Sequence, residues 1–243
     1  NMGRAYEVRK AAMAKTAAMK SKVNNKYGRS IYLAAKSGIP DPELNQALKK
    51  EIEKAKSEKV PADVIKRAIE KAQGLGSENY TSVRYEGFGP NNSMFVIECE
   101  TDNPNRTYID VRTAFSKANC KLGVNGSVIH MFSNLAAFSF EGLTEDEVLE
   151  GLIASDCDVT EIKEEDGLIS VFAPITEYAK VKQALLDLKP DLEFLEDQIA
   201  WIPSVYVKLT DENDKKMFDR LMALLDEIED VQDVYHNIEF DEE

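Results

Sequence analysis

Residues 136–198 read AAFSFEGLTEDEVLEGLIASDCDVTEIKEEDGLISVFAPITEYAKVKQALLDLKPDLEFLEDQ and contain a complete series of short strands and helices. Apolar residues follow strand patterns at 136–140, 159–163, 168–173 and 193–198, and they recur at helical spacing at 145–154 and 176–188. This βαββαβ order is the ferredoxin-like plan, in which one sheet carries two helices on a face. We therefore predict a ferredoxin-like domain at residues 134–201.

The segments on either side of this domain each have the pattern of one βαβ unit. The first has strands at 94–99 and 127–132 around a helix at 106–118, and the second has strands at 205–209 and 231–238 around a helix at 212–228. Each unit is half of the same plan. We therefore predict that the two join into a discontinuous ferredoxin-like α/β domain, 79–133 plus 202–243, into which residues 134–201 are inserted.

Residues 1–78 differ in composition and are predicted to form a basic helical domain. Strong helix formers predict helices at 5–22 and 25–36, and Asp41 has the pattern of an N-cap before a third helix. Pro61 begins a further amphipathic helix. The expected fold class is α+β: an N-terminal helical bundle domain followed by two ferredoxin-like α/β domains, one inserted into the other.

Composition argues against an enzyme. The chain has two histidines, and its three cysteines, Cys99, Cys120 and Cys157, are widely spaced without a C-x-x-C pair. Most metal sites, nucleophile–base pairs and disulfide frameworks need these residues in closer patterns. Gly87 and Gly89 precede a predicted strand, whereas a dinucleotide-binding loop follows one, so a turn is the favoured interpretation. We expect no catalytic residues, no metal, no cofactor and no small-molecule substrate.

Hydropathy predicts no membrane partner. The sequence has no run of 18 or more apolar residues, and its first residues lack the apolar segment that directs secretion. Three cysteines without a pairing pattern fit a reducing compartment. We expect a cytoplasmic protein.

Charge is the compositional feature that indicates a partner. The net charge is −14, but residues 1–73 carry 17 Lys and Arg against 8 Asp and Glu, whereas residues 74–243 carry 13 against 36. Residues 1–38 contain nine basic residues and one acid, Glu7. Such asymmetry is typical of contact with nucleic acid or a membrane surface. Trp, Phe and Leu, which a membrane-surface helix needs, are absent before Leu33, so phosphate is the expected ligand.

Ten basic residues are the candidate nucleic-acid-binding residues. They are Arg4, Arg9, Lys10, Lys15, Lys20, Lys22, Lys26, Arg29, Lys36 and Arg106. The alternative for those before residue 38 is a solvated helix face, but the acids that usually pair with such lysines are missing there. Arg106 opens a predicted helix, where its charge opposes the helix dipole. It has two interpretations, a clamp on the neighbouring acidic loop or a contact offered to a phosphate.

Several motifs are shared with a known family. They are Tyr85-Glu-Gly-Phe-Gly-Pro90, Thr101-Asp-Asn-Pro-Asn-Arg-Thr107, Val111-Arg-Thr-Ala-Phe-Ser-Lys117 and Gly123-Val-Asn-Gly-Ser-Val128. Through them nearly the whole chain resembles the YebC/PmpR family. This family comprises probable transcriptional regulators and ribosome-associated translation factors, among them the mitochondrial translational activator of cytochrome c oxidase. The resemblance implies a three-domain fold and a cytoplasmic, non-catalytic regulator that binds nucleic acid.

The opening segment departs from the usual family pattern. Residues 3–10 read GRAYEVRK, which resembles the YeeN-like subgroup, and Asn91-Asn92 stands where the family has Gly-Gly. The favoured function is a nucleic-acid-binding regulator of gene expression, specifically a DNA-binding transcriptional regulator. The alternative is a translation factor that binds the ribosome or ribosomal RNA during elongation. A ligand-sensing module and a protein-interaction adaptor are the remaining classes, because ferredoxin-like domains serve many functions.

Overall fold

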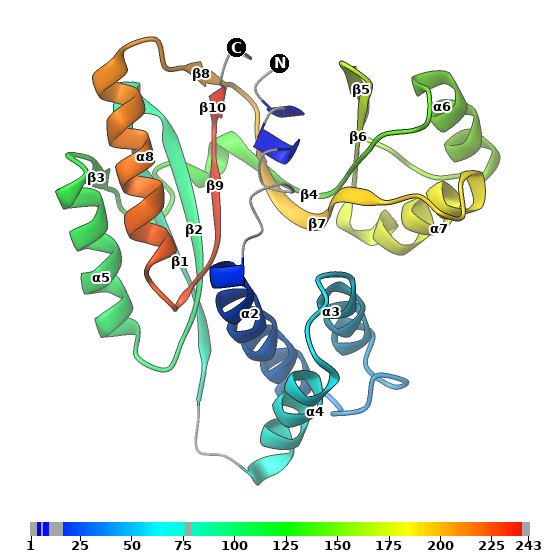
Figure 1. Ribbon diagram of the computed structural model, residues 1–243, viewed down its shortest axis with the longest axis horizontal. Helices are drawn as coiled ribbons and strands as arrows, with labels where there is room; N and C mark the ends of the chain where they lie inside the picture. Colours follow the sequence, from blue (N-terminus) through cyan, green and yellow to red (C-terminus); the bar gives the residue numbers. More distant parts are fainter. Residues whose placement is uncertain (1–3, 6, 10–16, 76–78, 240–243) are drawn as a thin grey trace.

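The computed structural model describes residues 4–5, 7–9, 17–75 and 79–239, with the backbone alone at residues 17–22 and 75. Figure 1 shows a helical unit, a sheet covered by α5 (Pro104–Lys117) and α8 (Glu212–Asp226), and a second sheet beside α6 (Glu145–Ala154) and α7 (Tyr178–Leu188). The predicted α+β class is confirmed. Of the helices in the described part of the chain, none is both long and apolar enough to span a bilayer.

The helical unit comes first in the chain. Its elements are α2 (Ala17–Lys36), α3 (Gln46–Ser57), α4 (Ala62–Glu70) and the π-helical turn η1 (Lys71–Leu75). Apolar residues at helical spacing give the helices buried stripes, and Ile31, Leu48, Ile52 and Ile65 form their shared core. Gly74, with a φ of 102°, follows α4 in a conformation that side chains disfavour.

The predicted boundary between helices 5–22 and 25–36 is wrong. From Ala17 onward α2 is continuous, and Asn24 and Asn25 lie inside it. Asparagine costs about half a kcal/mol in a helix interior, which is small beside the tertiary packing of an amphipathic helix.

The helix predicted to start at Asp41 begins at Gln46 instead. Asn45 is its cap, because the Asn45 side chain accepts a hydrogen bond from the Leu48 N–H at 3.0 Å. The same side chain also donates to two backbone carbonyls, those of Ala34 and Ile39, each at 2.9 Å. Asn45 therefore fixes the whole connection between α2 and α3.

The second unit is built on a four-stranded antiparallel sheet with the order β3-β1-β2-β9. Its strands are β1 (Thr81–Phe88), β2 (Met94–Thr101), β3 (Lys121–Leu122) and β9 (Val231–His236). α5 and α8 lie side by side on one face and bury Phe95, Phe115, Leu221 and Leu225 against it (Figure 1). Beside this sheet, β8 (Val207–Lys208) pairs in parallel with β10 (Ile238–Glu239).

Two of the strands predicted for this sheet are not part of it. β1, which was not predicted as a strand, is part of it. The segment 127–132 contains a short 3-10 helix, η3 (Ile129–Met131), and the segment 205–209 contributes only β8. β1 lies between β3 and β2. Its strand pattern is hidden by Gly87, where a Cβ atom would come within 2.5 Å of the Phe115 ring.

Glu86 of β1 holds the following loop by its side chain. The residue is 3% exposed, and its carboxylate accepts hydrogen bonds from the N–H groups of Gly126, Val128 and Ile129 at 2.6, 3.0 and 2.7 Å. Burial alone would raise the pKa of this carboxyl, but the three N–H donors outweigh burial and hold its pKa below its ordinary value. The buried Glu86 carboxylate therefore holds the loop at 126–129 through its backbone N–H groups, as pairing with a neighbouring strand would.

The third unit has the ferredoxin-like strand order β5-β6-β4-β7. Its strands are β4 (Phe132–Phe140), β5 (Glu161–Glu165), β6 (Leu168–Ala173) and β7 (Phe194–Pro203). α6 and α7 cover one face and bury Phe138, Phe140, Leu152 and Leu185. β4 and β7 are longer than predicted because they continue to the junction with the second unit.

The side chain of Trp201 on β7 joins the two sheets. It packs near Val96 and Phe132, and its Nε1 donates to Glu98 Oε1 at 3.1 Å. The Arg84 guanidinium lies 4.7 Å from the centre of its ring. These contacts fix the second and third units relative to each other.

Candidate nucleic-acid interface

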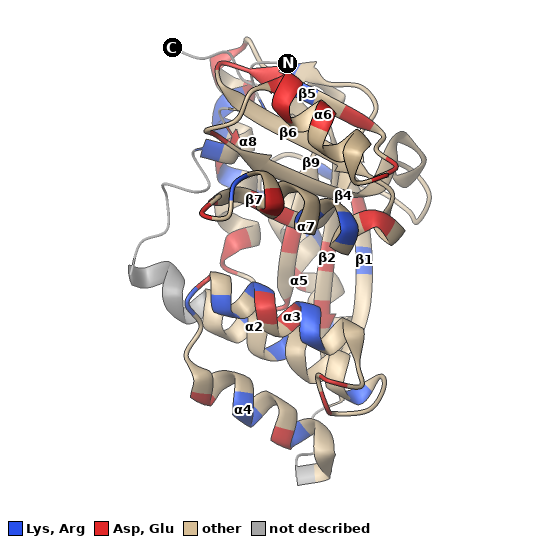
Figure 2. Cartoon of the chain, turned by 90° about the vertical axis from the view of Figure 1, so that its right-hand side faces the viewer, with Lys and Arg blue, Asp and Glu red and all other residues tan. Residues whose placement is uncertain are grey.

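Six of the ten candidate basic residues have described side chains. Lys10 and Lys15 lie outside the described residues, and Lys20 and Lys22 lie on the part of α2 whose side chains are outside them. Figure 2 shows the helical unit packed below strands of the other two units, on which many Asp and Glu residues lie.

Arg4 and Arg9 contact the third unit. Arg4 forms an ion pair with Glu196 on β7. Arg9 Nε lies 2.9 Å from Glu141 Oε1, and Arg9 Nη2 donates to the carbonyl of Asp166 at 2.8 Å. In this structure both arginines therefore attach the N-terminal segment to the acidic third unit.

Lys26 and Arg29 contact the second unit. They are three residues apart on α2 and so share one face of the helix. Lys26 Nζ lies 2.6 Å from Asp233 Oδ1. Arg29 Nη1 donates to the carbonyl of Glu229 at 2.9 Å and lies 3.2 Å from Asp230 Oδ1. One face of α2 is thus held against the second unit by opposite charge.

Asp230 brings together two candidate residues from different units. Its side chain is 5% exposed and contacts both Arg29 of α2 and Arg106 of α5. Arg106 Nη2 lies 3.1 Å from Asp230 Oδ2 and 2.8 Å from Asp102 Oδ1, and the Thr107 hydroxyl donates to Asp230 at 2.8 Å. Arg106 therefore binds the carboxylates of the neighbouring acidic loop, which is the first of its two interpretations. A contact between Arg106 and phosphate stays a prediction.

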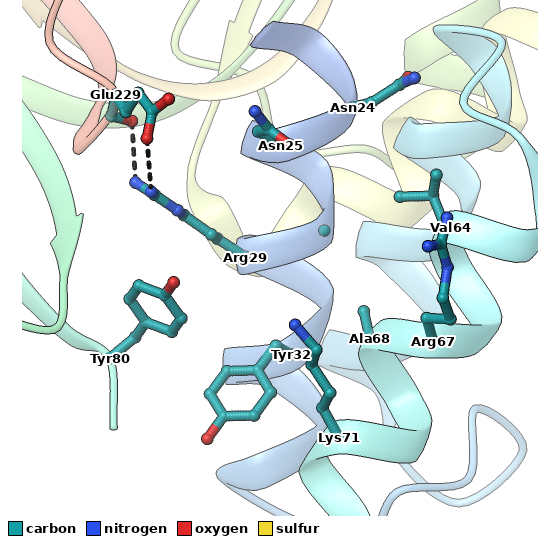
Figure 3. Close-up of a pocket in the computed structure, with 11 residues that line it drawn as sticks. Asn24, Asn25, Arg29, Tyr32, Val64, Arg67, Ala68, Lys71, Tyr80 and Glu229 are labelled. Carbon is teal, nitrogen blue, oxygen red and sulfur yellow. Dashed lines mark hydrogen bonds and ion pairs between the residues drawn. The ribbon is translucent and has the colours of Figure 1, made fainter. Parts of the chain in front are cut away.

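A groove begins beside Arg29. A recess of about 350 Å³ has α2 as its floor and α4 as one wall, and the segment at Tyr80 forms the other wall (Figure 3). Arg67 and Lys71 lie on the α4 side. A second recess, of about 650 Å³, shares Arg29 and Tyr80 with the first and extends along α5 and α8. We call the two recesses together the interdomain groove.

The groove contains residues that sequence reasoning missed. Arg67 and Lys71 line the first recess, Lys117 lines the second, and Tyr80 lines both. The spacing of four between Arg67 and Lys71 was a usable signal, because it puts both on one helix side. No sequence pattern around Tyr80 indicated that it would line a groove. Lys36 is not among the lining residues of either recess, but its Nζ lies 2.8 Å from both Asn79 Oδ1 and Tyr32 Oη, and Tyr32 lines the first recess.

A third recess, of about 480 Å³, lies where the three units meet and is rich in carboxylates. Glu100 is one of them. Burial is the main cause that raises the pKa of Glu100 to about 7, the hydrogen bond from Ser82 opposes the rise, and the charges of Glu98 and Asp233 add to it. This carboxyl therefore titrates near neutral pH in the folded protein.

We expect Glu100 to make the protein less stable as the pH rises through neutrality. A carboxyl whose folded pKa is raised binds more protons in the folded state, so its contribution is present below the unfolded pKa and is lost as the pH rises through about 7. Glu100→Gln should flatten the decline of Tm between about pH 5 and pH 8, and Glu193→Gln, at an exposed position, should not. Equal declines in wild type and Glu100→Gln would contradict this assignment.

The cysteines have the properties of structural thiols. Burial raises the pKa of Cys99 and Cys157, and raises that of Cys120 to about 11. A reactive cysteine needs the opposite shift, toward the thiolate. Within the described ranges, His, Cys, Asp and Glu side chains form no group of three or more suited to a metal ion.

The fold and the groove define a class of α+β proteins in which a helical unit docks on two sheet-containing units that are joined through their sheets. The chain belongs to the TACO1/YebC family. The family model of the TACO1/YebC protein N-terminal domain matches residues 4–75, and that of the TACO1/YebC second and third domain matches residues 80–238. The YeeN-like subgroup stays a prediction.

Relatives align over almost the full length. Probable transcriptional regulatory proteins of Acholeplasma laidlawii, Alcanivorax borkumensis and Pseudoalteromonas translucida are 53%, 52% and 51% identical, over at least 97% of this chain and 98% of each relative. A conserved hypothetical protein from Aquifex aeolicus has a solved structure with a TM-score of 0.82. It is 32% identical, and the match covers 95% of this chain and 94% of that one.

Proposed function

We propose that this protein is a regulator of gene expression that binds nucleic acid through the first recess of the interdomain groove and through basic residues of the helical unit. The observation that supports the proposal most is the first recess itself, where the exposed cations Arg67 and Lys71 lie on the α4 side and Tyr80 lies on the opposite wall. Cations along a groove bind the phosphate backbone, and aromatic rings beside them stack with bases. The relatives named as probable transcriptional regulatory proteins support transcription as the regulated process and DNA as the ligand.

A second role, on ribosomal RNA during translation, is favoured by the charge of the third unit. Residues 134–201 carry 17 Asp and Glu against four Lys. This negative field repels a long bare duplex, whose phosphates are dense along its whole length. A folded RNA surface can accept the basic side of the molecule while the acidic unit points away.

The salt dependence of binding tests the proposed function. Anisotropy titrations of a labelled oligonucleotide should show log affinity falling with log salt, with a slope of about −0.7 to −0.9 for each phosphate contacted. Replacing Lys10, Lys15, Lys20 and Lys22 with Gln should reduce the slope by roughly 3 and weaken binding at low salt. The same replacement at Lys180, Lys189, Lys215 and Lys216, which lie outside the proposed surface, is the matched control. An affinity that does not change with salt would contradict nucleic-acid binding.

Cross-linking in cells followed by sequencing separates the two roles. Recovery of promoter or gene DNA with the protein would support transcriptional regulation. Enrichment of ribosomal RNA would support the translational role instead. The variant in which Gln replaces the four N-terminal lysines should recover neither product, which would tie the cellular ligand to these lysines.

A further inference from the structure

The first recess of the groove has a glycine in its floor. Gly28 lies in the middle of α2, where glycine is less favourable than alanine because it loses more conformational freedom. A Cβ atom at this position would meet Val64 Cγ1 at 3.7 Å, which is an ordinary contact. Crowding therefore does not require glycine here. Glycine keeps the recess open at this position, because a larger side chain would fill it.

One wall of this recess is aromatic. Tyr80 is partly exposed, and its ring meets the Tyr32 ring edge to face, with centroids 5.7 Å apart and an interplanar angle of 80°. The Arg29 guanidinium lies 5.2 Å from the centre of the Tyr80 ring. An aromatic ring and a guanidinium plane are the two surfaces on which proteins stack unpaired bases.

The rest of the lining includes one carboxylate, Glu229, which lies 3.6 Å from Arg29 Nη2, and polar groups suited to a nucleotide. Asn24 and Asn25 lie at one end of the recess, and each amide offers both a donor and an acceptor, as the edge of a base requires (Figure 3). Arg67 is exposed on α4 and Lys71 is exposed just after it. Cations at the rim are placed for the phosphates that flank a base held inside.

We propose that this recess binds one unpaired nucleotide of a nucleic-acid strand, an inference that rests on the proposed function. The base enters above Gly28 and stacks beside Tyr80, while Asn24 and Asn25 contact its edge. A volume of about 350 Å³ lies at the small end of the range for ligand sites, which suits one nucleotide unit. A paired base cannot enter, because its faces are covered by stacking and its edge by pairing.

Filling the recess tests this proposal. Gly28→Leu should weaken binding of a single-stranded 12-mer carrying 2-aminopurine by at least about ten-fold, and the quenching of 2-aminopurine on binding should be lost. Gly28→Ala should have an intermediate effect. Tyr80→Ala should weaken binding roughly 5- to 150-fold through lost stacking, whereas Tyr80→Phe should retain most of it. The salt slope should stay constant in all four variants, because no charge is removed.

Controls and comparison strands make the outcome decisive. Gln46→Leu adds a leucine on an exposed part of α3, and Tyr108→Ala removes a tyrosine that is 45% exposed on α5, and both should bind as wild type does. Thermal melting verifies that each variant folds. An effect of Gly28→Leu on RNA alone or on DNA alone identifies the source of the nucleotide, and both results support the pocket.

Two results would overturn the pocket while leaving the proposed function intact. One is equal affinity of wild type and Gly28→Leu for the single strand. The other is equal affinity of wild type for single strand and duplex, with 2-aminopurine fluorescence unchanged on binding. Failure of the proposed function looks different, since then no oligonucleotide of either form binds wild type in a salt-dependent way.

Discussion

Replacing Asp230 with alanine is expected to lower the free energy of unfolding by about 3 kcal/mol. The Asp230 side chain is 5% exposed and contacts Arg29, Arg106 and Thr107 at once. Alanine would leave two guanidinium groups near each other without their shared carboxylate. Removing one partner of a buried ion pair is costly because the remaining charge stays buried. The Arg29 side chain is only 15% exposed, so its guanidinium would keep the backbone carbonyls of Glu100 and Glu229 but regain little hydration.

Urea unfolding followed by circular dichroism measures this effect. Glu227→Ala is the matched control, since it removes an exposed carboxylate three residues away and should change stability by less than about 0.5 kcal/mol. Asp230→Asn should lie between the two, because its amide oxygen still accepts a hydrogen bond. A loss of less than about 1 kcal/mol for Asp230→Ala would show that Asp230 does not hold the units together.

The second large effect is expected at Glu86. Glu86→Ala leaves the N–H groups of Gly126, Val128 and Ile129 without their acceptor, and a buried unsatisfied donor costs about 1–3 kcal/mol. Allowing for water entry at the surface end of the loop, we expect a loss of about 3 kcal/mol. Urea unfolding gives the loss, and hydrogen exchange should show the three amides exchanging faster than in wild type.

The same carboxylate predicts sensitivity to acid. The pKa of Glu86 is lowered in the folded state, so its stabilising contribution is present above the unfolded pKa and is lost as the pH falls through the folded value. Glu86→Gln keeps one acceptor oxygen but does not titrate. Its stability deficit relative to wild type should therefore shrink between about pH 7 and pH 3, whereas Glu150→Gln, at an exposed position, should show no such trend. A deficit that is the same at both pH values would contradict the role of the charge.

The third unit could be predicted because its local signals agree with its final packing. β6 and the second half of β4 are nearly continuous apolar runs, and Thr144 caps α6 by accepting from the Glu147 N–H at 3.1 Å. β1 could not be predicted in the same way. Its buried positions include Glu86 and Gly87, which are residues that strand patterns count as polar or breaking. Both are explained only by partners distant in the sequence, a loop at 126–129 for the carboxylate and Phe115 for the glycine.

The concentration of positive charge before residue 38 could be counted in the sequence, but its partners could not. Asp230 is 201 residues from Arg29 and 124 residues from Arg106, and no local pattern spans such distances. Few Asp and Glu residues lie near these basic residues in the sequence, and this scarcity indicated that they bind an external phosphate. For Lys26 and Arg29 the structure gives another explanation. Their carboxylate partners are supplied by the second unit.

The pairing of β2 with β9 has a consequence for synthesis. β9 follows β2 by about 130 residues, so at about 5–20 residues per second a nascent chain waits roughly 6–26 s before β2 gains its second neighbour. The whole third unit is made during this interval and can fold first. Until then one edge of β2 is open to pairing with other chains, which is the hazard of any uncovered strand edge. The order of synthesis therefore lets the middle of the polypeptide fold before the sheet that surrounds it in the sequence is complete.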